Sequence, residues 1–246
     1  SSARGLAATR VAAVGAVTPA VQQNNKPVVL YLHGFEEFAK SPQPQRYPVL
    51  EALGLVLGDA YEVYAPSYHP GGEIYHTNFI STLGKLKKRA LETPTGSFEA
   101  VVGWSVGGWL AAVFQEQCPE LVGRLILLGP CIDMAERECY DKGVWAKYGA
   151  DMAALPSRPI IKRPTHIFHG DLESDEGGAD PKRVKAWTAN NTGMMTLDNL
   201  NDVDHVNLLV AKVLLPKGSY YHLFKTAVKW SVGQGSLAFS GGPHVF

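Results

Sequence analysis

The chain of 246 residues is poor in cysteine, carries no net charge and has no long apolar run. Its three cysteines lack zinc-ligand spacing, so we expect reduced thiols rather than a disulfide scaffold or zinc site, with one Cys131–Cys139 bridge as the alternative. The formal net charge of +0 argues against binding to nucleic acid or to an anionic membrane surface. No apolar run has the length of a membrane span, so no transmembrane segment is predicted.

Two kinds of ligand site are also missing. No Gly-Gly pair is followed by the Gly-Lys-Ser or Gly-Lys-Thr of a phosphate-binding loop. His69 and His76 flank a glycine-rich loop, but no third ligand stands at metal spacing. We therefore expect a protein that works without a metal ion or another cofactor.

Acidic residues are absent from Ser1 to Phe35, where arginine, serine, threonine and alanine are frequent. This composition resembles an organellar transit peptide or its remnant, and a plain N-terminal extension is the alternative. We expect residues 1–25 to be such an extension and residues 26–246 to form one domain. The hydrophobic content of 46% is that of a globular chain. We expect a soluble protein of the cytoplasm or, given the acid-free N-terminus, of an organelle.

Apolar, strand-like runs alternate with helical patterns from Pro27 onward. This alternation predicts an α/β fold with a mostly parallel central sheet and helices on both of its faces. The expected strands are residues 27–35, 61–65, 98–102, 124–128, 164–170 and 194–197. The expected helices are residues 47–57 and 78–91, a segment after residue 105 and a segment that starts near residue 181.

The motif Gly103-Trp104-Ser105-Val106-Gly107 lies between an apolar strand and an apolar helix. A sharp strand-to-helix turn holds its central residue in a strained conformation, and side chains two positions either side would collide. Gly103 and Gly107 remove these collisions. The Ser105 hydroxyl is then exposed at a helix N-terminus, where developing negative charge is favoured. The sequence therefore predicts that Ser105 is a nucleophile.

An earlier buried strand ends in His33-Gly34-Phe35, and together with the serine turn this motif resembles the α/β-hydrolase superfamily. The resemblance implies an α/β-hydrolase fold with a short cap insertion, here about residues 132–162. It also implies that the backbone N–H groups of Phe35 and Val106 form an oxyanion hole, while His33 braces its loop. Trp104 and Tyr68 are the residues that we expect to line the substrate pocket.

The same resemblance assigns the base and its acid. His205 stands in a polar turn after the last expected strand, where the family has the histidine that takes the serine proton and returns it to the leaving group. The acid belongs on the loop after His169-Gly170, and Asp175 is the first choice because its surroundings best match the usual run into the next helix. The alternatives are Asp171, nearest the strand end, Glu173, at the usual spacing but of the less common residue type, and Asp133.

Together these features predict a serine hydrolase that cleaves a carboxylic ester or thioester through an acyl-enzyme intermediate. The expected partner is a small-molecule ester or thioester. Two alternatives stay open. One is an acyltransferase or lyase that uses the same residues, and the other is a ligand-binding protein that keeps the fold without turnover. The sequence carries no signal for the oligomeric state.

Overall fold

A six-stranded sheet forms the centre of the described chain, and all neighbouring strands in it are parallel. The computed structural model describes residues 25–34, 48–67, 78–133, 152–174, 179–191, 193–205, 208 and 213–237. The spatial order of the strands is β2-β1-β3-β4-β5-β6. Their bounds are β1 Val28–Leu32, β2 Glu62–Tyr64, β3 Phe98–Trp104, β4 Val122–Leu128, β5 Thr165–Gly170 and β6 Met195–Leu200.

Helices follow the strands in alternation, as the sequence pattern predicts. Their bounds are α2 Pro48–Leu57, α3 Phe79–Leu91, α4 Val106–Gln117, α6 Pro181–Ala189 and α7 Tyr221–Ser231, with short 3₁₀ segments η2 Gly58–Ala60 and η5 Pro119–Leu121. Among the described residues, no helix is long and apolar enough to cross a membrane.

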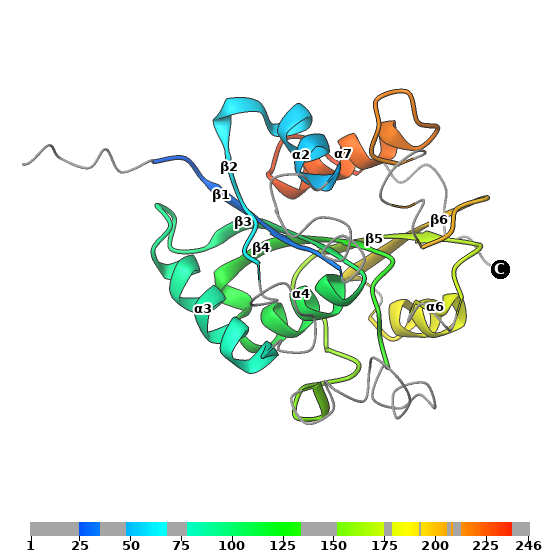
Figure 1. Ribbon diagram of the computed structural model, residues 1–246, viewed down its shortest axis with the longest axis horizontal. Helices are drawn as coiled ribbons and strands as arrows, with labels where there is room; N and C mark the ends of the chain where they lie inside the picture. Colours follow the sequence, from blue (N-terminus) through cyan, green and yellow to red (C-terminus); the bar gives the residue numbers. More distant parts are fainter. Residues whose placement is uncertain are drawn as a thin grey trace, which may run out of the picture.

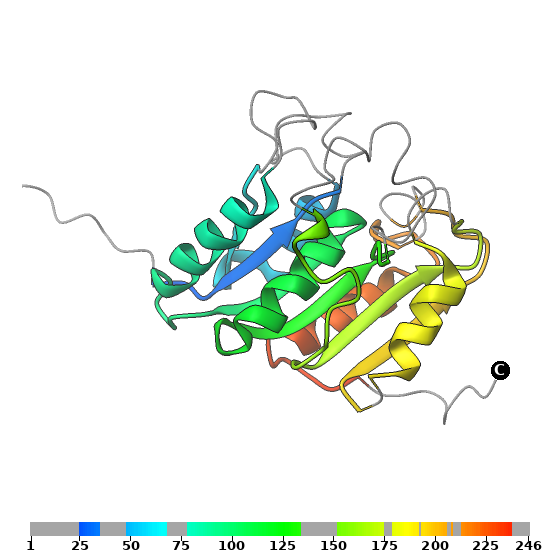
Figure 2. The same ribbon diagram turned by 90° about the horizontal axis from the view of Figure 1, so that it is seen from below.

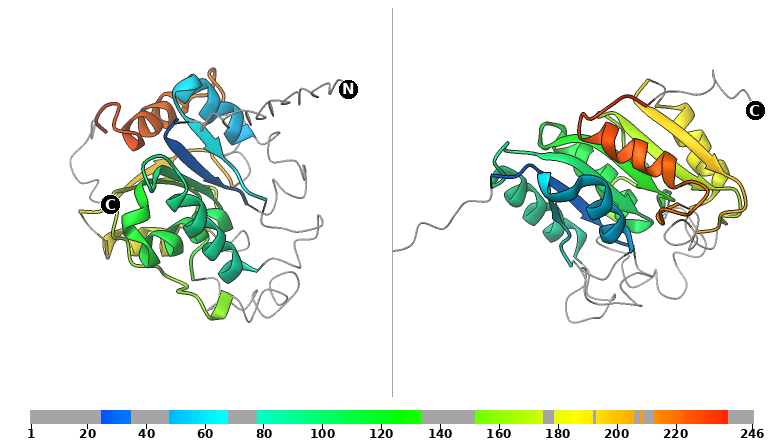
Figure 3. Two further views of the ribbon diagram at one scale, coloured as in Figure 1. Left: turned by 90° about the vertical axis from the view of Figure 1, so that its left-hand side faces the viewer. Right: turned by 90° about the horizontal axis from the view of Figure 1, so that it is seen from above.

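The helices form a layer on each face of the sheet (Figure 1). α2 and α7 lie side by side over one face (Figure 3, right), and α3, α4 and α6 cover the other (Figure 2). Alternate residues of one strand enter opposite cores: Leu30 packs on the α3 and α4 side, and Tyr31 on the α2 and α7 side. Strands buried on both faces must be apolar throughout, which explains the continuous apolar runs of the sequence.

Two helices begin at residues suited to capping. The Asn78 side chain accepts a hydrogen bond of 2.7 Å from the Ser81 N–H at the start of α3. The Asp180 side chain accepts one of 2.9 Å from the Lys182 N–H at the start of α6, where Pro181 is the first helical residue. These caps satisfy backbone donors that have no partner within a helix, and so fix where each helix starts.

The carboxyl ends of the parallel strands meet at one edge of the sheet. Ser105 follows β3, Glu173 follows β5 and His205 follows β6. Loops at this edge of an open α/β sheet are where such folds bind their ligands. The topology therefore brings together residues that are far apart in the sequence.

In the connection between β4 and β5, residues near its two ends contact each other. The Asp133 N–H donates a hydrogen bond of 3.0 Å to the Ser157 carbonyl oxygen. The buried Asp133 carboxylate accepts from Arg158 Nε at 2.9 Å and lies 3.6 Å from Arg183 Nη1 of α6. Residues 134–151, the larger part of the expected cap, lie outside the described residues, as do residues 1–24.

Candidate active site

Ser105 occupies a strained turn between β3 and α4. Its φ of 56° and ψ of −124° are rare for a residue with a side chain. A Cβ at Gly107 would lie 2.2 Å from the Leu32 carbonyl oxygen, and one at Gly103 would lie 2.6 Å from the Gly107 carbonyl oxygen. Only glycine fits at either position, and the turn therefore has the geometry expected for a nucleophile elbow.

The Ser105 hydroxyl lies at the end of a chain of three polar side chains. Its Oγ is 2.9 Å from Nε2 of His205, and Nδ1 of the same ring is 2.9 Å from Oε2 of Glu173. With the ring neutral, the hydroxyl donates to Nε2 and the Nδ1–H donates to the carboxylate. The Glu173 side chain is fully buried and that of His205 is 12% exposed, so the acid is shielded from water and the base is slightly exposed.

The Glu173 carboxylate is held by its own loop. Its Oε1 accepts a hydrogen bond of 3.0 Å from the Gly170 N–H and lies 3.7 Å from Nε2 of His169. The Glu173 N–H in turn donates to the Gly170 carbonyl at 3.3 Å. This tight turn folds the Glu173 side chain back toward the sheet, and both carboxylate oxygens are thereby engaged.

The acid on the ring differs from the first choice made from the sequence. Glu173, an alternative there, contacts His205, whereas Asp175 lies outside the described residues. Asp171 is exposed and its Oδ1 is 3.4 Å from the Val203 N–H, and Asp133 pairs with arginines. We therefore replace Asp175 by Glu173 as the candidate acid, because the turn after Gly170 points residue 173 inward.

One of the two expected oxyanion donors lies within the described residues. Val106 is the first residue of α4, so its N–H has no acceptor within the helix and points out of the helix N-terminus. Phe35, the other expected donor, lies outside the described residues. Burial lowers the pKa of His33 to about 4, while a hydrogen bond between its Nδ1 and the Gly34 carbonyl oxygen acts in the opposite direction. His33 is therefore a neutral, buried residue of this loop at neutral pH.

Of the two residues expected to line the pocket, the structure describes Trp104 but not Tyr68. Trp104 is fully buried at the end of β3, and its ring stacks on that of His205 with centroids 5.3 Å apart and planes at 28°. It thus contacts the candidate base and is closed off from solvent. Tyr68 lies outside the described residues.

Sequence reasoning missed Cys131, whose Sγ lies 3.3 Å from Ser105 Oγ. The Cys131 N–H also donates a hydrogen bond of 3.1 Å to the Ser105 carbonyl oxygen. The strand order could have revealed this contact. Ser105 follows β3, and Cys131 follows β4, the strand that pairs with β3. The fully buried thiol therefore helps to enclose the hydroxyl on the side of β4.

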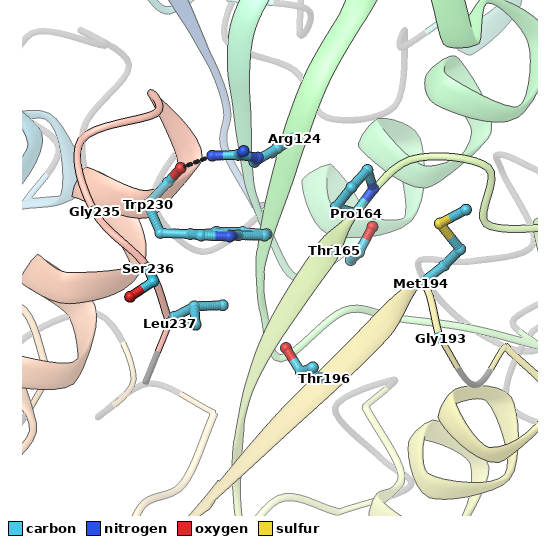
Figure 4. Close-up of a pocket in the computed structure, with 10 residues that line it drawn as sticks. All are labelled: Arg124, Pro164, Thr165, Gly193, Met194, Thr196, Trp230, Gly235, Ser236 and Leu237. Carbon is cyan, nitrogen blue, oxygen red and sulfur yellow. Dashed lines mark hydrogen bonds between the residues drawn. The ribbon is translucent and has the colours of Figure 1, made fainter. Parts of the chain in front are cut away.

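A hollow of about 340 Å³ lies at the opposite edge of the sheet, near the starts of β4, β5 and β6 (Figure 4). The Arg124 guanidinium lies 5.1 Å from the centre of the Trp230 ring there and donates to the Trp230 carbonyl oxygen. The same carbonyl, in the last turn of α7, also accepts from the Gly233 N–H, so the contact joins β4 to α7 and gives Arg124 a structural role. Because the hollow lies at the strand starts and Ser105 follows the end of β3, the two sites are separate.

The described residues of the site form no constellation for a metal. Within the described ranges, no group of at least three His, Cys, Asp or Glu side chains is arranged to hold a metal ion. The arrangement of Ser105, His205 and Glu173 instead suits proton transfer from a hydroxyl to a ring, with a carboxylate that stabilises the charged ring.

Comparison of the sequence with protein-family models gives no match, and comparison with curated proteins gives none either. Comparison with solved structures does give matches. Est1E from Butyrivibrio proteoclasticus has a TM-score of 0.61 at 15% identity, over 86% of this chain and 90% of its own. The esterase Pf2001 from Pyrococcus furiosus has a TM-score of 0.59 at 16% identity, over 86% of this chain and 82% of its own.

A third similar structure is a serine hydrolase without a lid from Xanthomonas campestris, with a TM-score of 0.53 at 14% identity. It covers 84% of this chain and 81% of its own length. At these identities the likeness concerns the fold. The parallel sheet, its helical layers and these neighbours agree: the chain has the fold of the α/β-hydrolase superfamily.

Proposed function

We propose that the protein is a serine hydrolase that cleaves carboxylic esters or thioesters, with Ser105, His205 and Glu173 as its catalytic residues. The proposal is supported above all by the unbroken series of contacts from a buried carboxylate through a ring to a hydroxyl, each 2.9 Å long. The strained turn at Ser105 supports it independently.

In the proposed mechanism, Ser105 Oγ attacks the acyl carbon while Nε2 of His205 takes the hydroxyl proton. The ring becomes positively charged, and the Glu173 carboxylate at Nδ1 stabilises that charge. The N–H groups of Val106 and Phe35 hold the oxyanion. His205 then gives its proton to the leaving alcohol or thiol, and water cleaves the acyl-enzyme by the same steps.

We propose a class of substrates, carboxylic esters and thioesters, rather than a single compound. We expect the cap segment, about residues 132–162, to shape the pocket that receives the acyl group. Est1E has been described with ferulic acid bound. Methyl ferulate is therefore a suitable member of a substrate panel, beside p-nitrophenyl esters of increasing acyl length and an acyl thioester.

The decisive experiment is covalent labelling with a fluorophosphonate, combined with turnover of the ester panel. We expect the wild-type protein to be labelled and to cleave at least one ester, and Ser105→Ala to fold normally but do neither. Ser231→Ala is the matched control, because Ser231 is also a buried serine but lies in α7, where its hydroxyl bonds to Val228.

Two results would contradict the proposal. One is a wild-type protein that is neither labelled nor active, which would favour a binding protein. The other is a Ser105→Ala variant that keeps full activity. Product analysis with an added alcohol separates hydrolysis from acyl transfer, because a transferase would form the new ester in place of the free acid.

A further inference from the structure

One face of the candidate base is covered by an indole. Trp104 ends β3, and its ring lies 5.3 Å from the His205 ring, centre to centre, with the two planes only 28° apart. The two rings are therefore stacked at a tilt. Glu173 and Ser105 contact the edge of the imidazole at its nitrogens, so the indole provides a contact of a different kind.

The indole is also seated against the loop after β1. A Cβ at Gly34 would lie 2.3 Å from Cε3 and 2.5 Å from Cζ3 of Trp104. Any side chain at Gly34 would push the indole out of its position. The position of the Trp104 ring therefore requires glycine at residue 34. The ring lies between the loop that carries the expected oxyanion donor and the His205 ring.

Stability alone does not account for an indole here. Its Nε1–H is buried and has no hydrogen-bond partner within the part of the chain that the structure describes. Burial of a donor without an acceptor is unfavourable, and phenylalanine would fill the space without that penalty. Among the described residues, the other fully buried indoles do bond: Trp109 donates to the Pro156 carbonyl oxygen and Trp187 to that of Pro159.

We propose that Trp104 is a positioning residue that holds the His205 ring in line with Ser105 and stabilises its protonated form through the face of the indole. The inference rests on the proposed function. The face of an indole carries partial negative charge and attracts a cation, and among the aromatic side chains tryptophan does this best. The ring gains positive charge when it accepts the serine proton, so the interaction strengthens in the transition state.

Other titratable groups near the ring stay the same when only Trp104 is changed. Glu173 lies at Nδ1 with His169 behind it, and Cys131 lies against Ser105 Oγ. Asp202 and Asp204 belong to the same loop as His205. Trp104 variants therefore keep the same set of titratable groups around the ring as the wild type.

The test compares Trp104→Leu, which removes the aromatic face, with Trp104→Phe, which keeps one. Acylation by p-nitrophenyl acetate is measured from pH 4.5 to 8. We expect Trp104→Leu to move the acidic midpoint of the profile to lower pH by about half a unit to one and a half units, because the protonated ring is less stabilised. The plateau rate falls about two- to thirtyfold for the same reason. Trp104→Phe should restore most of both.

Trp187→Leu is the matched control, since it truncates an equally buried indole in α6 and should lower stability without moving the midpoint. A second readout follows the ring protons of His205 by NMR during a pH titration and needs no turnover. Trp104→Leu with an unmoved midpoint in both readouts, or Trp104→Phe as impaired as Trp104→Leu, overturns the inference. Failure of the proposed function shows differently, as a wild-type protein that a fluorophosphonate does not label.

Discussion

Replacement of Glu173 by glutamine tests the acid of the site most directly. The substitution keeps the shape of the side chain and an oxygen for the Gly170 N–H, which is 3.0 Å from Oε1. It removes the negative charge that lies 2.9 Å from Nδ1 of His205. Folding should therefore be little affected, while the charged ring loses its counterion.

The expected loss follows from the electrostatics of this contact. Two unit charges about 4 Å apart at an effective dielectric constant near 20 interact by about 4 kcal/mol, which corresponds to a factor of about 10³ in rate. The glutamine can also favour the wrong tautomer of the ring, and loss of the acid of such a triad costs up to about 10⁴ in kcat. We therefore expect Glu173→Gln to lower kcat by about 10³ to 10⁴.

The assay is steady-state turnover of p-nitrophenyl acetate together with the rate of fluorophosphonate labelling. Asp171→Asn is the matched control and should change kcat by less than about threefold, because Asp171 is exposed and does not contact the ring. Glu173→Ala is less clean, since it leaves the Gly170 N–H unpaired and should also destabilise the fold by about 1–3 kcal/mol. A Glu173→Gln variant with a rate close to that of the wild type would refute the reasoning.

Two further predictions concern residues beside the site. Gly129→Ala should lower kcat by about tenfold or more, because the new Cβ would lie 2.8 Å from both Glu173 oxygens at a residue whose φ is +48°; steady-state kinetics checks this, and an unchanged kcat would mean that the acid tolerates displacement. For His33 the folded pKa of about 4 lies below the ordinary 6.5, so the unfolded chain takes up a proton first as the pH falls. Its contribution to the free energy of unfolding is complete above pH 6.5 and is lost toward pH 4, a difference of about 3 kcal/mol. Urea unfolding at several pH values should show this slope in the wild type and a weaker one in His33→Asn, and equal slopes would contradict it.

Most strands and helices could be predicted from local patterns in the sequence. The buried strands read as continuous apolar runs because both of their faces are covered, as at Leu30 and Tyr31. The helix α7 was not predicted, although its buried residues Phe224, Ala227 and Val228 have helical spacing that could have revealed it. Strand β6 also runs on to Leu200, past the expected end at residue 197.

The acid could not be chosen from the sequence because the three candidates Asp171, Glu173 and Asp175 follow Gly170 within a short stretch. Which of them faces His205 depends on contacts with a distant part of the chain. Asp171 and Leu172 remain hydrogen-bonded to Leu200 and Val203, and the chain turns inward only at the next residue. The stacking of Trp104 on His205 has the same origin, since no local pattern reports which residue covers a ring far along the sequence.

The pairing of Asp133 with Ser157 and Arg158 has a consequence for how this chain can change. A segment whose two ends are already fastened together can be lengthened, shortened or exchanged with little effect on the strands that flank it, because each doubling of a loop costs only about 0.6 kcal/mol in closure entropy. Ser105, Glu173 and His205 all lie outside this fastened segment. If the proposed function is right, this segment can be exchanged to alter substrate preference while the three proposed catalytic residues stay in place.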